Sequence, residues 1–161
     1  MIDAIDVRLL KVPLTRPYRL AFGAVDHYDT ILVSLASADG RTGYGEATLL
    51  TGYTDETLAG SWPLACELAH VLVGSDFGAF VRRIDAITGR APFVATAFRT
   101  ALDLLRGHPL LATPIDTPLR VPILGLLQGD GETELDETFA HLLDDGYRTV
   151  KVKVGFDVGA D

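Results

Sequence analysis

The fold of the C-terminal part of the chain is decided by residues 147–155, which read Tyr147-Arg148-Thr149-Val150-Lys151-Val152-Lys153-Val154-Gly155. This run is rich in β-branched residues and lies between two glycines, which predicts a β-strand. Because side chains alternate between the two faces of a strand, Lys151 and Lys153 share one face. At a rise of about 3.3 Å per residue, their Cα atoms lie roughly 7 Å apart.

The chemistry of Lys151 and Lys153 depends on where this face points. If the face lines a closed site, burial and the repulsion between two ammonium groups both favour a neutral amine, which can act as a general base. If the face is exposed to solvent, the two lysines instead protect an edge strand against aggregation. The Lys-x-Lys pattern is short and common, so both interpretations stay open at this point.

The composition limits the classes of function. The 161 residues suit one domain, or one small domain with part of another. The formal net charge of −8, without a basic stripe, argues against partners such as nucleic acid and anionic membrane. No apolar run approaches the ~18 residues of a membrane span, and the first residues lack the pattern of a signal peptide, so we expect a cytoplasmic protein.

Cysteine and histidine offer no metal site. The single cysteine, Cys66, excludes an internal disulfide and a multi-cysteine site, and its apolar neighbours predict a buried packing role. The four histidines have no spacing typical of metal ligands. They are His27, His70, His108 and His141.

The first 50 residues predict a three-stranded antiparallel meander. We expect strands over residues 2–14 and 29–38 and a third from Arg41 onward, with Asp39-Gly40 as the hairpin turn between the last two. Two prolines, Pro13 and Pro17, are expected to end the first strand and to leave residues 15–28 as an irregular segment. Two glycines in the third strand, Gly43 and Gly45, indicate a bulge or a close approach of another backbone.

Helices are expected next. Thr54 is a suitable N-cap, with Asp55 and Glu56 at the positive end of the helix dipole. Pro63 is expected to break this helix or to restart it with Ser61 as a new cap. A second helix is expected over residues 77–87. A third is expected between Pro92 and Gly107, with its buried side formed by Phe93, Ala97, Ala101, Leu104 and Leu105.

The pattern changes after a connector with three prolines at residues 108–118. Residues 121–127 form an apolar run typical of a strand that is covered on both faces. Residues 133–145 predict an amphipathic helix, whose inward side chains are Leu135, Phe139, Leu142 and Leu143. Together with the lysine strand these elements form a βαβ unit, so the two strands should be parallel.

This order of elements resembles the N-terminal part of the enolase superfamily, in its mandelate racemase and muconate-lactonizing branches. Four stretches carry the resemblance. They are Asp39-Gly40 with Gly43-Tyr44-Gly45-Glu46, then Tyr53-Thr54-Asp55-Glu56-Thr57, then the Pro92 helix with Ala101-Leu102-Asp103-Leu104-Leu105, and finally residues 146–155. None of these stretches is specific alone, but their order and spacing over the whole chain are.

The resemblance implies an α+β capping domain over residues 1–107, in which a three-stranded meander packs on a helical bundle. A connector at 108–119 and the beginning of a (β/α)8 barrel at 120–161 would follow. A barrel needs roughly 250 residues, so only one βαβ unit of it would be present. The metal ligands of the family come from later strands. We therefore expect Mg²⁺ in the complete enzyme and no metal ligand in this chain.

The resemblance also implies an activity. Enzymes of this family abstract a proton α to a carboxylate to give an enediolate, and then act as racemases, epimerases, cycloisomerases or dehydratases, that is, as isomerases or lyases. Lys153 would correspond to the base, and Lys151 would favour its neutral form and help to hold the carboxylate. This implication favours the catalytic interpretation of the two lysines, although the 161-residue chain alone is expected to be inactive.

Loops of the capping domain would close over a small carboxylate substrate. The side chains they offer are Tyr18, Leu20, Phe22, Leu50 and Tyr53, which favour a partly apolar substrate. Arg16 and Arg19 either meet an anionic group or lie on the surface. The alternative function is that of a non-catalytic, capping-domain-like protein that associates with another chain. In either case we expect a homo-oligomer or a partner segment that completes the barrel.

Overall fold

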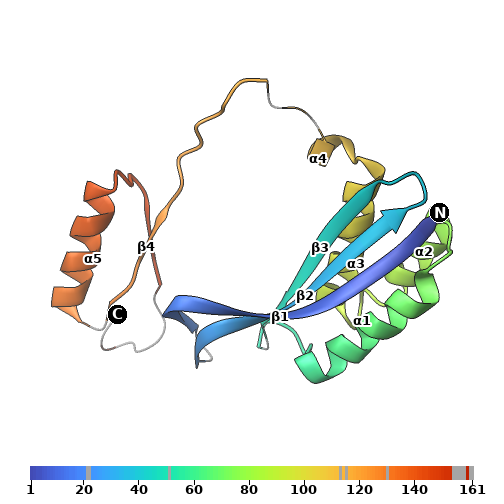
Figure 1. Ribbon diagram of the computed structural model, residues 1–161. Coiled ribbons are helices and arrows are strands. Elements are labelled where there is room, and N and C mark those ends of the chain that lie inside the picture. The colour runs from blue at the N-terminus through green and yellow to red at the C-terminus, as the bar shows by residue number, and fades with distance from the viewer. Residues whose placement is uncertain are drawn as a thin grey trace. The chain divides into compact units, whose positions relative to one another are not determined.

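The structure is a computed structural model that describes residues 1–20, 23–50, 52–112, 114, 116–129, 131–153 and 159 (Figure 1). Its strands are β1 (Ile2–Leu20), β2 (Gly23–Ser37), β3 (Thr42–Leu49), β4 (Gly125–Leu127) and β5 (Val150–Val152). Its helices are α1 (Leu58–Leu72), α2 (Phe77–Asp85), α3 (Pro92–Arg106), α4 (Pro109–Ala112) and α5 (Glu132–Asp144). The chain divides into two compact units, residues 1–113 and 114–161, which are described separately.

The first unit contains the predicted antiparallel meander, with strand order β1-β2-β3. The turn between β2 and β3 lies at Asp39-Gly40, where Gly40 has a φ of 84° and its N–H donates to the Ser37 carbonyl at 2.9 Å. Glycine adopts this left-handed conformation without steric cost. The meander and its hairpin turn are therefore confirmed.

The prediction that Pro13 and Pro17 end the first strand, and that residues 15–28 are irregular, is wrong. Strand β1 continues to Leu20, and β2 already begins at Gly23. Because β1 is an edge strand that pairs only with β2, a proline there can turn its missing donor away from the ladder. The cost is visible as a shift of register between Pro13 and Tyr18.

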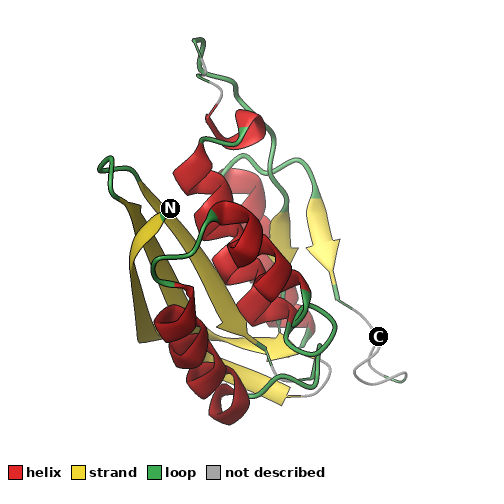
Figure 2. Ribbon diagram, turned by 90° about the vertical axis from the view of Figure 1, so that its right-hand side faces the viewer, coloured by secondary structure: helices red, strands yellow, loops and turns green. Residues whose placement is uncertain are grey.

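The helices of this unit cover one face of the sheet (Figure 2). The side chains of Ile31, Val33 and Leu35 alternate along β2 toward this face and are completely buried. They form one core with the buried faces of α1, α2 and α3. The aromatic rings of Phe80 in α2 and Phe98 in α3 lie with their centroids 6.2 Å apart and join these two helices within the core.

The glycines of β3 let α3 lie directly on the strand. A Cβ atom on Gly43 would lie 2.0 Å from the Ala101 carbonyl oxygen, so no other residue fits there without a shift of the helix. Pairing between β2 and β3 is continuous, so the glycines mark a close approach and not a bulge. Glu46, on the other face of β3, is exposed.

The start of α1 differs from the expectation. Its N-cap is Thr57 and not Thr54, because the Thr57 hydroxyl accepts the Gly60 N–H at 3.3 Å. Pro63 lies inside the helix without breaking it, and Ser61 is a buried helical residue instead of a cap. A proline inside a helix removes one hydrogen bond and its ring crowds the preceding turn, at a cost of about 3 kcal/mol. The core contacts of α1 outweigh that loss, and its buried apolar residues are Ala65, Leu68 and Leu72.

Helix α3 has the predicted bounds, with Gly107 in the left-handed conformation after its last residue. Helix α2 ends at Asp85, two residues before the expected end. The predicted buried side of α3 is partly wrong, since Leu104 is 39 % exposed and Phe93 is half-buried. Its buried face is wider than expected and consists of Val94, Ala95, Ala97, Phe98, Ala101, Leu102 and Leu105.

The second unit contains the predicted βαβ arrangement. Strands β4 and β5 are parallel, with Gly125 opposite Val150, and α5 connects them in sequence. Helix α5 packs on β4 through Leu142, because a Cβ atom on Gly125 would lie 2.5 Å from a methyl carbon of Leu142. The parallel pairing is therefore confirmed.

Other expectations for this unit are wrong. The strand predicted over 121–127 begins only at Gly125, and Val121 and Ile123 are 66 % and 68 % exposed. No residue of α5 is buried, although Phe139 and Leu143 were expected to point inward. A parallel sheet is normally covered on both faces, and the described part of this unit supplies only two strands and one helix. The short helix α4, which belongs to the first unit, forms within the predicted connector.

Among the described residues, no helix is both long enough and apolar enough to cross a bilayer.

Candidate functional site

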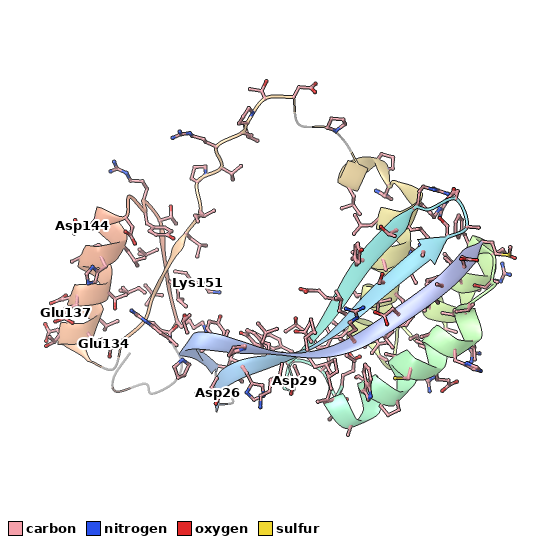
Figure 3. All side chains as sticks on the ribbon, in the orientation of Figure 1. Asp26, Asp29, Glu134, Glu137, Asp144 and Lys151 are labelled. Carbon is pink, nitrogen blue, oxygen red and sulfur yellow. The ribbon has the colours of Figure 1, made fainter. Side chains whose placement is uncertain are left out.

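The two lysines lie at the end of the βαβ unit. Lys151 is in β5, opposite Leu126 of β4, and is exposed. Figure 3 shows its side chain on the side of the β4-β5 pair away from α5. Lys153 follows the last residue of β5 by one position and is half-buried. Alternation along an extended chain puts it on the same face as Lys151.

An apolar hollow lies in the first unit. It has a volume of about 490 Å³, and we call it the Tyr53 hollow. Its lining residues are Tyr28, Thr48, Leu50, Tyr53, Thr54 and Phe93, which carry no formal charge. Two strands, the loop after β3 and the first residues of α3 therefore meet here. An uncharged lining with three aromatic rings and a leucine suits an apolar group.

The Tyr53 hollow contains two of the predicted substrate-facing residues, Leu50 and Tyr53. The structure does not bring Tyr18 and Leu20 into it. Tyr18 lies in β1 opposite Val25, and Leu20 is buried at the end of the same strand. Phe22 and the side chain of Arg19 lie outside the described residues, and Arg16 is exposed on β1.

Sequence reasoning missed four lining residues, Tyr28, Thr48, Thr54 and Phe93. Tyr28 fell within the segment predicted to be irregular, and Phe93 was assigned to the core side of its helix. The available signal was the parity of β2, since Tyr28 has the opposite parity to the core residues Ile31 and Val33. Its side chain must therefore point away from the face that the helices cover.

One buried carboxylate joins the loop of the hollow to α3. Glu56 is only 6 % exposed, and its Oε2 accepts the Phe93 N–H at 2.8 Å while its Oε1 accepts the Val94 N–H at 3.3 Å. Sequence analysis assigned Glu56 to the start of the preceding helix. The correction is that it serves the start of α3, which is 37 residues away in the sequence.

Two charge pairs involve residues that do not line the hollow. At the hairpin turn, Arg41 donates to the Asp39 carboxylate from Nε at 2.9 Å and approaches it from Nη2 at 2.8 Å. This guanidinium, with the Ser37 hydroxyl, holds the pKa of Asp39 well below its usual range. At the start of β2, a hydrogen bond to His27 lowers the pKa of Asp26 (labelled in Figure 3). Both pairs are exposed, so they stabilise turns and strands locally.

The described residues do not fit a magnesium ion. Within them, no three side chains of histidine, cysteine, aspartate or glutamate come together in a way that could hold a metal. Mg²⁺ needs several oxygen ligands in near-octahedral geometry.

The fold defines a class of protein. A three-stranded meander with helices on one face, followed by a parallel βαβ unit, is the capping domain of the enolase superfamily and the start of its barrel. The chain belongs to the mandelate racemase and muconate lactonizing enzyme family. Residues 4–106 match the family described as "Mandelate racemase / muconate lactonizing enzyme, N-terminal domain".

Curated relatives match almost the whole chain. An L-Lys-D/L-Arg epimerase of Methylococcus capsulatus is 34 % identical over 98 % of this chain and 46 % of its own length. An aromatic dipeptide epimerase of Herpetosiphon aurantiacus is 30 % identical over 99 % of this chain and 47 % of its own length. The chain thus spans about half the length of the curated relatives it matches.

Solved structures agree with the fold. A mandelate racemase/muconate lactonizing protein from Herpetosiphon aurantiacus superimposes with a TM-score of 0.80 at 25 % identity, over 99 % of this chain and 47 % of that one. A dipeptide epimerase from Enterococcus faecalis, in complex with Mg and L-Leu-L-Tyr, gives a TM-score of 0.83 at 24 % identity, with the same two coverages. At that identity, the second likeness shows the fold alone.

Proposed function

We propose that the complete protein containing this segment is a magnesium-dependent epimerase that inverts the α-carbon of a dipeptide or a related carboxylate. In this proposal, residues 120–161 begin the barrel and residues 1–107 form its cap. The observation that carries the proposal is the pair Lys151 and Lys153, in a chain whose curated relatives are epimerases. Lys151 lies in a parallel strand of the βαβ unit, and Lys153 follows the end of that strand by one position. The ligands of Mg²⁺ would come from residues outside those described.

The role of Lys153 follows from the chemistry of an α-proton. Its neutral amine takes the proton from the α-carbon, and the electron pair of the broken C–H bond moves toward the carboxylate to give an enediolate. Lys151, a positive charge on the same face, attracts the substrate carboxylate. Return of a proton to the opposite face completes the inversion, and this step requires a second acid that we do not assign to the described residues.

The lining of the Tyr53 hollow favours a substrate with an apolar side chain. Its lining is uncharged and mostly apolar or aromatic, whereas a cationic side chain would need an acidic partner to offset the loss of its water shell. The Methylococcus relative is named for cationic residues and the Herpetosiphon relative for aromatic ones. We therefore place the substrate of this protein with the apolar and aromatic dipeptides.

The test is a substrate panel on the complete protein with Mg²⁺ present. L-Leu-L-Tyr and L-Ala-L-Phe are compared with L-Lys-L-Arg and with L-mandelate, and inversion is followed by chiral chromatography. We expect inversion of the apolar dipeptides with a kcat/KM at least tenfold above that for L-Lys-L-Arg. A folded protein that inverts none of the dipeptides contradicts the proposal, and a preference for L-Lys-L-Arg contradicts its substrate class.

The second candidate function is association without catalysis. It is favoured by the exposed apolar residues of the second unit, among them Val121, Ile123 and Leu143. Contiguous exposed apolar surface marks sites of protein interaction. Sedimentation of the 161-residue chain distinguishes the two candidates together with the substrate panel. A stable oligomer with no epimerase activity in the complete protein supports association alone.

A further inference from the structure

We propose that Glu56 is a positioning residue, which holds the two walls of the Tyr53 hollow at a fixed separation. One wall is formed by residue 50 and residues 52–57, which include Leu50, Tyr53 and Thr54. The other wall is the start of α3, which carries Phe93. Hydrogen bonds of Glu56 link it to both walls. The consequence of this link for substrate binding rests on the proposed function.

The contacts of Glu56 reach both walls. On the loop side, the Glu56 N–H donates to the Thr54 hydroxyl at 3.2 Å, and this hydroxyl in turn lies 3.5 Å from the Glu56 carboxylate. On the helix side, the same carboxylate accepts the N–H groups of Phe93 and Val94. Thr54 and Phe93 both line the hollow, so a single carboxylate bridges two of its lining residues.

The start of α3 depends on this remote acceptor. Its N-cap is Ala91, which makes no side-chain hydrogen bond to the helix, and Pro92 has no N–H. The first free N–H groups of a helix need acceptors, and an anion is favoured at its positive end. A local serine or aspartate at the cap would satisfy them without any link to the loop. The acceptor is instead a buried residue of the loop, which ties the position of the loop to that of α3.

The loop needs such an anchor because its central side chain has little packing. Tyr53 is 67 % exposed, and its N–H donates to the Leu50 carbonyl at 3.1 Å to form a turn. Apolar burial therefore contributes little to the position of the Tyr53 side chain. The buried Glu56, at the end of the same loop, fixes the loop backbone through its hydrogen bonds. Loss of the carboxylate should make the walls of the hollow more mobile. It should leave the role of Lys153, in the other unit, unchanged.

The test compares Glu56→Ala with a matched variant, Asp76→Ala, in the complete protein. Asp76 also caps a helix, since its carboxylate accepts the Ala79 N–H at the start of α2 at 2.7 Å, but it does not line the hollow. In amide hydrogen exchange, we expect Glu56→Ala to accelerate Tyr53, Phe93 and Val94 by tenfold or more. Asp76→Ala should accelerate Ala79 and leave these three amides unchanged.

Kinetics with an apolar dipeptide give the second readout. We expect Glu56→Ala to raise KM by about tenfold to a hundredfold, as for a misplaced positioning group, while kcat stays within about twofold of the parent. Glu56→Gln keeps one acceptor oxygen and should recover part of the loss, and it replaces Glu56→Ala if that variant does not fold. Asp76→Ala should leave KM unchanged.

The outcomes separate this inference from the proposed function. If the parent protein inverts no dipeptide, the proposed function fails, and the exchange of the Tyr53 amide alone decides whether Glu56 holds the loop. If the parent is active and neither the Tyr53 amide nor KM responds to Glu56→Ala or Glu56→Gln more than to Asp76→Ala, the positioning role of Glu56 is overturned. A fall in kcat with unchanged KM also overturns it.

Discussion

Gly45 lies directly against Ala97, because a Cβ atom on Gly45 would be only 1.9 Å from the Ala97 carbonyl oxygen. We predict that Gly45→Ala lowers the free energy of unfolding by about 3 kcal/mol, at the upper end of the usual cost of overpacking a core. Urea unfolding measures the change. The matched control is Gly89→Ala, where a Cβ atom meets nothing within 4 Å and the effect should be close to zero. Equal stability of the two variants would contradict the close packing of α3 on β3.

The sequence predicted this feature only in general form. Glycines at Gly43 and Gly45 indicated either a bulge or a close approach, and only the continuous register with β2 decides between them. The meander, the turn at Gly40 and the bounds of α3 depend on local signals, and these were predicted correctly. The failures at Pro13 and Pro17 arose because a proline acts differently on an edge strand, and strand order is not a local property.

The candidate site was less predictable than the fold. Leu50 and Tyr53 were identified from the resemblance to the family, but the other walls of their hollow come from Tyr28 and Phe93, which are distant in sequence. The assignment of Glu56 failed for the same reason, because the N–H groups that donate to its carboxylate belong to α3. A contact across 37 residues leaves no periodic pattern in the sequence.

The exposed charge pair at the hairpin turn makes stability depend on pH. The pKa of Asp39 is lowered in the folded chain, mainly by hydrogen bonds from Arg41 and then by the Ser37 hydroxyl, from an unfolded value of 3.8. A depressed carboxylate pKa adds stability that is present above the unfolded pKa and is lost as the pH falls toward the folded one. We predict that the stability difference between the parent and Asp39→Asn shrinks from about pH 5 downward. The same comparison in an Arg41→Ala background should be nearly independent of pH.

The two units should differ in their protection from hydrogen exchange. Strand β2 pairs with a strand on each side, and side chains such as those of Val33 and Leu35 are buried in the core. Amides of α5 belong to a helix without a buried residue. In the 161-residue chain we predict slow exchange in β2 and exchange at least a hundredfold faster in α5, as expected for local opening of weakly packed elements. Uniform protection in a chain shown to be monomeric would contradict this difference.

Lys151 should contribute to turnover through its charge, whereas Lys153 is proposed as the base. Lys151→Ala removes a positive charge that attracts the substrate carboxylate and stabilises the negative charge of the enediolate. We predict a lower kcat and a higher KM for an apolar dipeptide in the complete protein. Lys11→Ala is the matched control, since Lys11 is an exposed lysine on an edge strand of the other unit, and it should change neither constant. A Lys151→Ala variant that behaves like Lys11→Ala would favour the interpretation of Lys151 as a solvated edge residue.

Incorporation of deuterium at the substrate α-carbon tests the role of Lys153 most directly. The complete protein, with Mg²⁺ and an apolar dipeptide at saturation, is placed in heavy water, and exchange from each stereoisomer is followed by NMR. Because Lys153 is proposed as the base for one face, Lys153→Ala should lower exchange from one stereoisomer by about 10²–10⁴-fold while the variant stays folded. If folded Lys153→Ala exchanges both stereoisomers as fast as the parent, Lys153 is not the base.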